Sequence, residues 1–256
     1  MTGNSARVLA PLLDPLSPVS LETLDERAPL LQRIDHKYVI EWDTFVELLA
    51  RLGDDHDVLE VAGRRASAYR SVYFDTDDLR CFREHRDGVL PRFKARTRLY
   101  VDTGACVFEV KLKQEGGETD KRQVEHPADR AAELLPEARE LVDAVLADAG
   151  VAPAPDLEPR LQTAFDRVTL AARDGSERVT ADLGVRLSQL GDGAVSLRPE
   201  LVVVETKSED GAGAGDEAMA ALGAEPVSLS KYRLGVDALL ERDDTGELDA
   251  VRGLFA

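Results

Sequence analysis

The sequence predicts an α+β fold in which one antiparallel sheet curls into a barrel, a tunnel with a charged interior and helices packed outside. Segments typical of strands follow one another with hairpin turns between them, and several of these strands carry apolar residues on one face and cations on the other. The chain as a whole is strongly acidic, with a formal net charge of -17. A solvated strand face in such a protein should carry Asp and Glu, so we expect the cationic faces to surround a wet lumen.

The composition suits a soluble globular protein, because 43% of the 256 residues are hydrophobic and 32% are charged. The excess of acidic residues argues against general binding of nucleic acid or anionic membranes. No apolar run approaches the roughly 20 residues that a membrane-spanning helix needs. The two cysteines, Cys81 and Cys106, are far apart and lack metal-ligand spacing, which is typical of free thiols in a reducing compartment. We therefore expect a cytoplasmic protein without a membrane span.

Helical patterns flank the strands. Residues 1–29 are expected to form a partly flexible N-terminal tail, because prolines interrupt their short apolar run. Residues 42–52 carry apolar side chains at helical spacing, as do residues 128–149, in which Pro136 marks a break or a new first turn. A glycine-rich loop then precedes a short helix at 217–222, and a last amphipathic segment follows Gly235.

Strands are predicted between these helices. The segments are RSVYFDT, LPRFKARTRLY, ACVFEVKLK, KRQVEH, TAFDRVTLAAR, ERVTADLGV and LVVVETKS. Hairpin signals such as RDG and DGSE lie between several of them. This succession favours an antiparallel sheet over repeated βαβ units.

The strand PRFKARTRLY shows the unusual charge pattern most clearly, since cations occupy alternate positions: Arg92, Lys94, Arg96 and Arg98. Alone, it could be a solvated edge strand whose charges prevent further pairing. Three other strands repeat the pattern, however, and place together Glu109, Lys111 and Lys113, then Arg178, Thr180 and Asp182, then Glu205 and Lys207. Like charges at this density repel one another, so the lumen requires an anion with several charges, and phosphate suits both Arg and Lys.

Carboxylates within a phosphate site can hold Mg²⁺ or Mn²⁺ together with phosphate oxygens, and Glu109 and Glu205 are placed for this. The alternative for each is a salt bridge to a neighbouring cation. No P-loop, dinucleotide-binding glycine motif, HExxH or GxSxG is present.

The ordered set RIDHKYVI, SVYFDTDDLRCFREHRDG, PRFKARTRLY, FEVKLK, AFDRVTL, ERVTADL, VVETKS and LSKYR resembles the VTC (vacuolar transporter chaperone) domain. This domain is the polyphosphate polymerase branch of the triphosphate tunnel metalloenzymes. The resemblance covers residues 30–241 and leaves 242–256 as a C-terminal helical tail. It implies an antiparallel barrel with a basic tunnel and a metal-dependent phosphotransferase that moves the terminal phosphate of ATP onto a growing polyphosphate chain.

The resemblance also implies roles for single residues. Catalytic roles fall to Arg96, Arg98, Lys111 and Lys231. Substrate binding falls to Lys37, Lys94, Lys121, Arg122, Arg167, Arg178 and Lys207. Glu205 and Glu109 would hold Mn²⁺ or Mg²⁺, whereas Arg33 and Asp35 stand where many tunnel enzymes have ExExK. The alternatives are a triphosphate or nucleotide phosphohydrolase of the same fold and a non-catalytic polyphosphate-binding module; the oligomeric state is left open.

Overall fold

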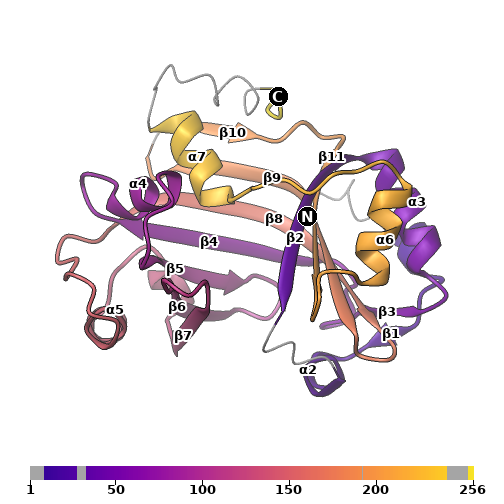
Figure 1. The fold of residues 1–256 in the computed structure, drawn as a ribbon, viewed down its shortest axis with the longest axis horizontal. Helices are drawn as coiled ribbons and strands as arrows, with labels where there is room; N and C mark the ends of the chain where they lie inside the picture. Colours follow the sequence, from indigo (N-terminus) through magenta and orange to yellow (C-terminus); the bar gives the residue numbers. More distant parts are fainter. Residues whose placement is uncertain (1–8, 28–32, 192, 241–252) are drawn as a thin grey trace.

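The computed structural model describes residues 9–27, 33–191, 193–240 and 253–256. Within these residues the fold is α+β, and its main element is an 11-stranded sheet (Figure 1). Every pairing along its main path is antiparallel, as predicted. In spatial order the path consists of β2 (Ile34–Glu41), β11 (Leu201–Ser208), β9 (Glu177–Gln189), β8 (Glu158–Ala172), β4 (Ser67–Asp75), β5 (Arg92–Tyr100), β6 (Ala105–Lys113) and β7 (Thr119–Glu125).

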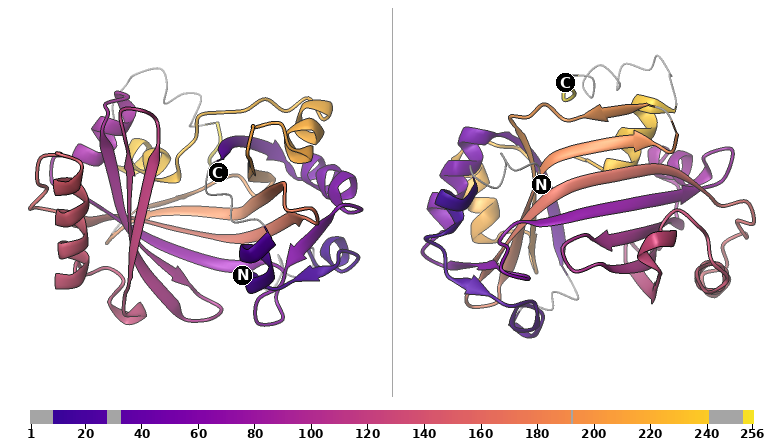
Figure 2. Two further views of the ribbon diagram at one scale, coloured as in Figure 1. Left: turned by 60° about the horizontal axis from the view of Figure 1, so that its bottom comes forward. Right: turned by 180° about the vertical axis from the view of Figure 1, so that it is seen from behind.

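The sheet curves but does not close, so the predicted barrel is only approximate. Its terminal strands β2 and β7 do not pair with each other in the described part of the chain. Both carry charged side chains, which favour an unpaired edge. Figure 2 shows the two halves of the strongly twisted sheet facing each other across an open side.

Helices cover the convex face, and their apolar spacing explains their orientation. Helix α3 (Trp42–Leu52) has the predicted bounds and buries Phe45, Leu48, Leu49 and Leu52 along one stripe. It packs with α6 (Ala214–Ala221) over β2, β11 and β9. The helix predicted at 128–149 divides into a short 3₁₀ turn (Ala128–Arg130) and α5 (Pro136–Asp148), which begins at the proline.

Helix α7 (Lys231–Leu239) covers part of the concave face, at one end of the sheet (Figure 1). It begins before the segment that the sequence predicted, because the side chain of Ser230 accepts a hydrogen bond from the Arg233 N–H and caps the helix. Gly235 allows close packing on the sheet, since a Cβ there would lie 2.4 Å from a methyl of Leu161. Helix α4 (Arg80–Arg86) packs against α7 and β5.

Residues 9–27, within the predicted partly flexible N-terminal tail, pack against the rest of the fold. Leu9, Leu13 and Leu16 are spaced for one helical face and are buried in the core beneath α3. The chain continues as β1 (Pro18–Val19), which pairs with β3 (His56–Leu59), and as α2 (Leu21–Arg27).

At the other end of the chain, the predicted helical tail at 242–256 lies outside the described residues except for 253–256. There Phe255 forms a β-bridge with Leu197, just after β10 (Ala194–Ser196). No helix in the described ranges is both long and apolar enough to cross a membrane.

Candidate active site

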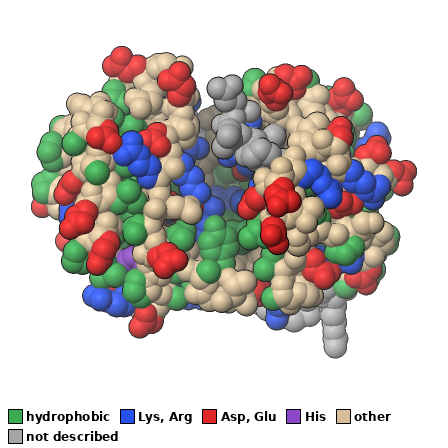
Figure 3. Space-filling view, turned by 90° about the horizontal axis from the view of Figure 1, so that it is seen from below, with side chains coloured by type: hydrophobic (Ala, Val, Ile, Leu, Met, Phe, Trp, Pro, Cys, Tyr) green, Lys and Arg blue, Asp and Glu red, His purple; other side chains and the backbone are tan. Residues whose placement is uncertain are grey.

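Strand register places the predicted cations on one concave face. Across β5 and β6, Arg96 lies opposite Glu109 and Lys94 opposite Lys111, and Lys111 in turn lies opposite Lys121 of β7. The alternate residues of β5, from Phe93 to Thr97, are buried on the other face, so the predicted assignment of faces is confirmed. Figure 3 shows Lys and Arg side chains within a cleft, with Asp and Glu on the surfaces around it.

The remaining strands continue the same face. Glu205 of β11 lies opposite Lys37 of β2 on one side and Thr180 of β9 on the other, and Asp182 of β9 lies opposite Arg167 of β8. Most of the predicted site residues therefore come together: Lys37, Lys94, Arg96, Arg98, Glu109, Lys111, Lys121, Arg167, Glu205, Lys207 and Lys231.

Glu109 holds a cluster of cations, and its role as a metal ligand stays a prediction. Its carboxylate accepts a hydrogen bond from Arg96 Nε at 2.7 Å and lies 2.6 Å from Lys121 Nζ, while Arg98 Nε is 3.8 Å away. Arg96 also donates to the Tyr73 hydroxyl at 2.8 Å, which fixes its guanidinium. Although burial opposes ionisation, these cations lower the pKa of Glu109 to about 2. Glu109 thus orients the arginines, and each of its oxygens lies beside a cation.

Asp182 forms a second cluster, which links the sheet to α7. Arg167 donates to both of its oxygens, at 2.6 and 2.8 Å, and Lys231 Nζ lies 2.5 Å away. Tyr69 lies under the Arg167 guanidinium, 5.2 Å from the ring centroid. Burial disfavours the ionised carboxylate, but the two cations lower the pKa of Asp182 to about 2. The sequence placed Asp182 on the cationic face but did not identify it as their partner.

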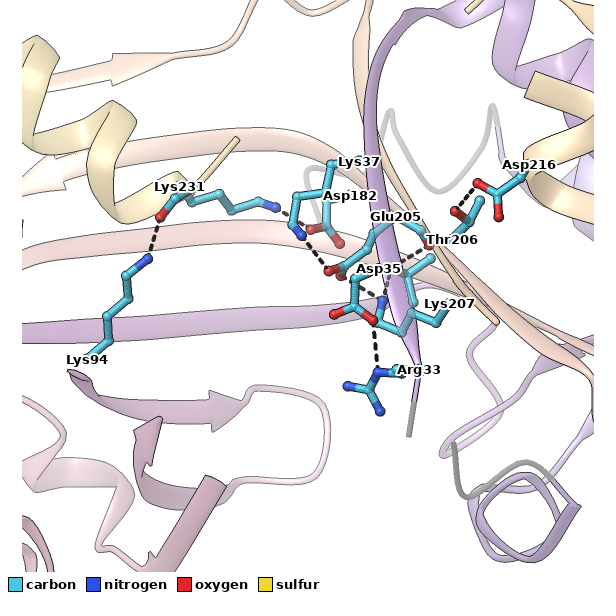
Figure 4. Close-up of polar contacts among 12 residues, drawn as sticks. Arg33, Asp35, Lys37, Lys94, Asp182, Glu205, Thr206, Lys207, Asp216 and Lys231 are labelled. Carbon is cyan, nitrogen blue, oxygen red and sulfur yellow. Dashed lines mark hydrogen bonds and ion pairs between the residues drawn. The ribbon is translucent and has the colours of Figure 1, made fainter. Parts of the chain in front are cut away.

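Glu205 lies between two lysines (Figure 4). Lys37 Nζ is 3.0 Å from its Oε1, and Lys207 donates to Oε2 at 2.6 Å. Despite burial, these lysines hold the pKa of Glu205 well below its ordinary range. Asp35 shares this face of β2 and accepts a hydrogen bond from Arg33 at 2.9 Å.

Asp216 supports these strands from behind. Its Oδ1 accepts hydrogen bonds from the hydroxyls of Tyr38 at 2.7 Å and Thr206 at 2.6 Å, and His36 Nδ1 lies 3.0 Å from it. These three neighbours alternate with Lys37 and Glu205 along β2 and β11. Asp216 therefore joins α6 to the two strands that carry the Glu205 cluster.

Positive charge remains in excess on the β5–β6 side. Lys111 has no ion pair in the part of the chain that the structure describes. Lys94 donates to the Ser230 hydroxyl at 3.0 Å, and burial together with Lys111 and Arg96 lowers its pKa to about 7. This side of the cleft can accept an anion.

Two predicted substrate-binding residues lie apart from this group. Arg122 is on the convex face, where it bonds Asp120 at 2.9 Å and Asp148 of α5 at 2.6 Å. Arg178 is on the concave face, but its guanidinium bonds the Leu24 carbonyl of α2 at 3.0 Å.

The donors around Glu205 fit a hard divalent cation only in part. Asp35 and Glu205 lie on adjacent strands and the same face, and Mg²⁺ or Mn²⁺ commonly takes one or two carboxylates with phosphate oxygens. Among the described residues, no group of three or more His, Cys, Asp or Glu side chains could hold a metal. A metal here would therefore need phosphate oxygens as further ligands.

The chain was compared with known families and proteins. A family model described as the VTC domain matches residues 32–240. A putative adenylyl cyclase from Hippeastrum, whose structure is described as revealing a dominant triphosphatase activity, shares 16% identity at a TM-score of 0.48, covering 82% of this chain and 98% of that one. A conserved hypothetical protein from Pyrococcus furiosus shares 15% identity at a TM-score of 0.40, covering 78% of this chain and 99% of that one. The protein PH1819 from Pyrococcus horikoshii OT3 shares 13% identity at a TM-score of 0.46, covering 82% of this chain and 99% of that one. The comparison with curated proteins gives no match.

Proposed function

This chain belongs to the VTC domain family, and from that membership we propose that it is a polyphosphate polymerase, which transfers the terminal phosphate of ATP to a growing polyphosphate chain. The observation that carries the proposal is the extended cationic face inside an acidic protein. It extends across the sheet from Lys37 on β2 to Lys121 on β7, and along β5 from Arg98 to Arg92. A face of this extent suits a chain of phosphates better than a single phosphate.

The chemistry requires alignment and charge stabilisation more than a protein nucleophile, because phosphoryl transfer passes through a loose transition state. Arg96 and Arg98 would grip the donor phosphates from β5, and Lys231 from α7 would contact them from the opposite side. Lys111, which has no carboxylate partner among the described residues, would stabilise negative charge on the transferred group. Glu109 and Asp182 keep the arginines in place throughout.

A divalent cation, when bound with the substrate, would neutralise charge on the phosphate oxygens. Glu205 would hold it, with Asp35 as its neighbour on β2. The acceptor would be the terminal phosphate of polyphosphate, and water in its place would give hydrolysis.

The decisive experiment incubates the purified protein with ATP and Mn²⁺ and separates the products on a gel. Long polyphosphate with ADP would support the proposal. Inorganic phosphate alone would indicate a triphosphatase, and no turnover despite polyphosphate binding would indicate a binding module. Glu205→Gln should abolish polymer formation, whereas Glu133→Gln, at an exposed ion pair with Arg130, should not.

A further inference from the structure

We propose that Lys37 and Lys207 occupy the metal site of the free protein, so that Glu205 accepts a divalent cation only after phosphate draws these lysines away. The inference rests on the proposed function for its phosphate ligand and adds an order of events to it. It makes metal binding conditional on the presence of the anion.

The first argument is the occupancy of the carboxylate. Each Glu205 oxygen has its own ammonium group, with Lys37 at Oε1 (3.0 Å) and Lys207 at Oε2 (2.6 Å) (Figure 4). A Mg²⁺ or Mn²⁺ ion must approach a carboxylate oxygen to about 2.0–2.2 Å, where it would compete for the same lone pairs and face two like charges. The divalent cation is therefore excluded while both lysines remain.

The second argument is that lysines alone hold Glu205, whereas Glu109 and Asp182 each bind an arginine as well as a lysine. Asp182 is gripped by both arms of the Arg167 guanidinium, and the Arg96 that binds Glu109 is also anchored by a tyrosine. Such forks are rigid. A lysine carries a point charge on a flexible stem, so its ammonium can move from one anion to another while its backbone stays in the strand.

The third argument is where the lysines can go. Lys37 and Lys207 lie on the cleft face of adjacent strands, and the side chain of Lys37 is 32% exposed. A phosphate chain in the cleft offers several charged oxygens, so each lysine can have a phosphate acceptor of its own in place of the shared carboxylate. Once the lysines bind phosphate, Glu205 and the phosphate oxygens together present the ligand set that the free protein lacks. By thermodynamic linkage, the anion and the metal then strengthen each other's binding by the same factor.

The test measures Mn²⁺ binding by electron paramagnetic resonance, with no nucleotide and no turnover. The free wild-type protein should bind Mn²⁺ weakly. Lys207→Met should tighten binding about ten- to a hundredfold, the worth of one charge-assisted hydrogen bond. Lys37→Met is a second variant with less risk of unfolding, because the Lys37 side chain is 32% exposed, and it should also tighten Mn²⁺ binding. Adding Glu205→Gln to either variant should remove the gain.

Lys111→Met is the matched control, because it removes the same charge from the same cleft without a contact to Glu205. An equal gain in this control would show a general field effect and overturn the proposal, as would unchanged Mn²⁺ affinity in both folded lysine variants. Sulfate serves as the anion probe. It should tighten Mn²⁺ binding to the wild type but not to the Lys37→Met/Lys207→Met double variant, and equal effects on both would also refute the exchange. The outcome is independent of polymerase activity, so the two proposals can fail separately.

Discussion

Replacing Asp182 with alanine should destabilise the protein and at the same time make it more responsive to phosphate. Asp182 is 2% exposed and binds Arg167 through both oxygens as well as Lys231 of α7. The substitution leaves these cations close together in a buried place without their counter-charge. Electrostatic repulsion would then push α7 away from the sheet.

The expected loss can be set from the kind of pair that is broken. Removing one partner of a buried ion pair costs about 3–5 kcal/mol. The side chains of Arg167 and Lys231 are still 16% and 14% exposed, so we expect the lower end, about 3 kcal/mol of unfolding free energy. For a chain of this size that corresponds to a fall in Tm of about 6–12 °C. Tripolyphosphate can supply the missing negative charge to Arg167 and Lys231, so it should raise the Tm of the variant more than that of the wild type.

Thermal unfolding followed by circular dichroism, with and without tripolyphosphate, provides the measurement. Asp57→Ala is the control, because Asp57 is also buried and also binds two arginines, Arg27 and Arg173, each at 2.8 Å, but beneath α2. It should lose comparable stability without a gain in the response to tripolyphosphate. A loss below about 1 kcal/mol for Asp182→Ala, or equal responses in the two variants, would refute the role of Asp182 as an internal counter-ion.

Three further predictions concern the cleft and its surroundings. Because the pKa of Lys94 is lowered to about 7, its ammonium group is charged below that pH and neutral above it. A bound anion favours the charged form, so tripolyphosphate binding at pH 8 should be accompanied by proton uptake, measured by calorimetry in buffers of different ionisation enthalpy. The Lys94→Met variant should take up fewer protons. Asp216→Ala removes the hydrogen-bond acceptor behind Lys37 and Glu205. It should lower the free energy of unfolding in urea by about 1–3 kcal/mol and raise the KM for ATP, and unchanged values would show that Asp216 does not support the Glu205 cluster. Arg122→Ala should leave the rate of polymer synthesis within about twofold of wild type, because Arg122 lies on the convex face. A much larger loss would show that Arg122 contributes to the active site.

The faces of the strands could be predicted from the sequence, because side chains alternate in a strand whatever its neighbours are. The same rule separates Lys121 from Arg122, which were both predicted to bind substrate. Arg122 shares a face with the apolar Val124, so Lys121 must face the cleft. The ion pairs could not be predicted in the same way. Lys231 meets Asp182 only because α7 returns across the sheet, and that return depends on packing such as the contact of Gly235 with Leu161.

Similarly, the open edge of the sheet and the docking of residues 9–27 depend on tertiary contacts between distant segments. Leu9 and Leu13 have helical spacing in the sequence, but nothing local identifies the core beneath α3 as their partner. The prolines near them suggested a flexible segment, whereas burial of the leucines outweighs the weak local propensity.

The distribution of carboxylates explains how the cleft stays folded without a ligand and still attracts one. Glu109 has three cations around it, whereas Asp182 and Glu205 have two each, and Lys111 has no ion-pair partner among the described residues. The positive excess therefore lies toward β5 and β6, and the Glu205 side is closer to neutral. A divalent cation bound at Glu205 would add positive charge to the less positive side, at β2 and β11, and make the cleft positive across its full width. A triphosphate lying across the strands would then meet cations along its whole length, which is the condition for holding its terminal phosphate in line with an acceptor.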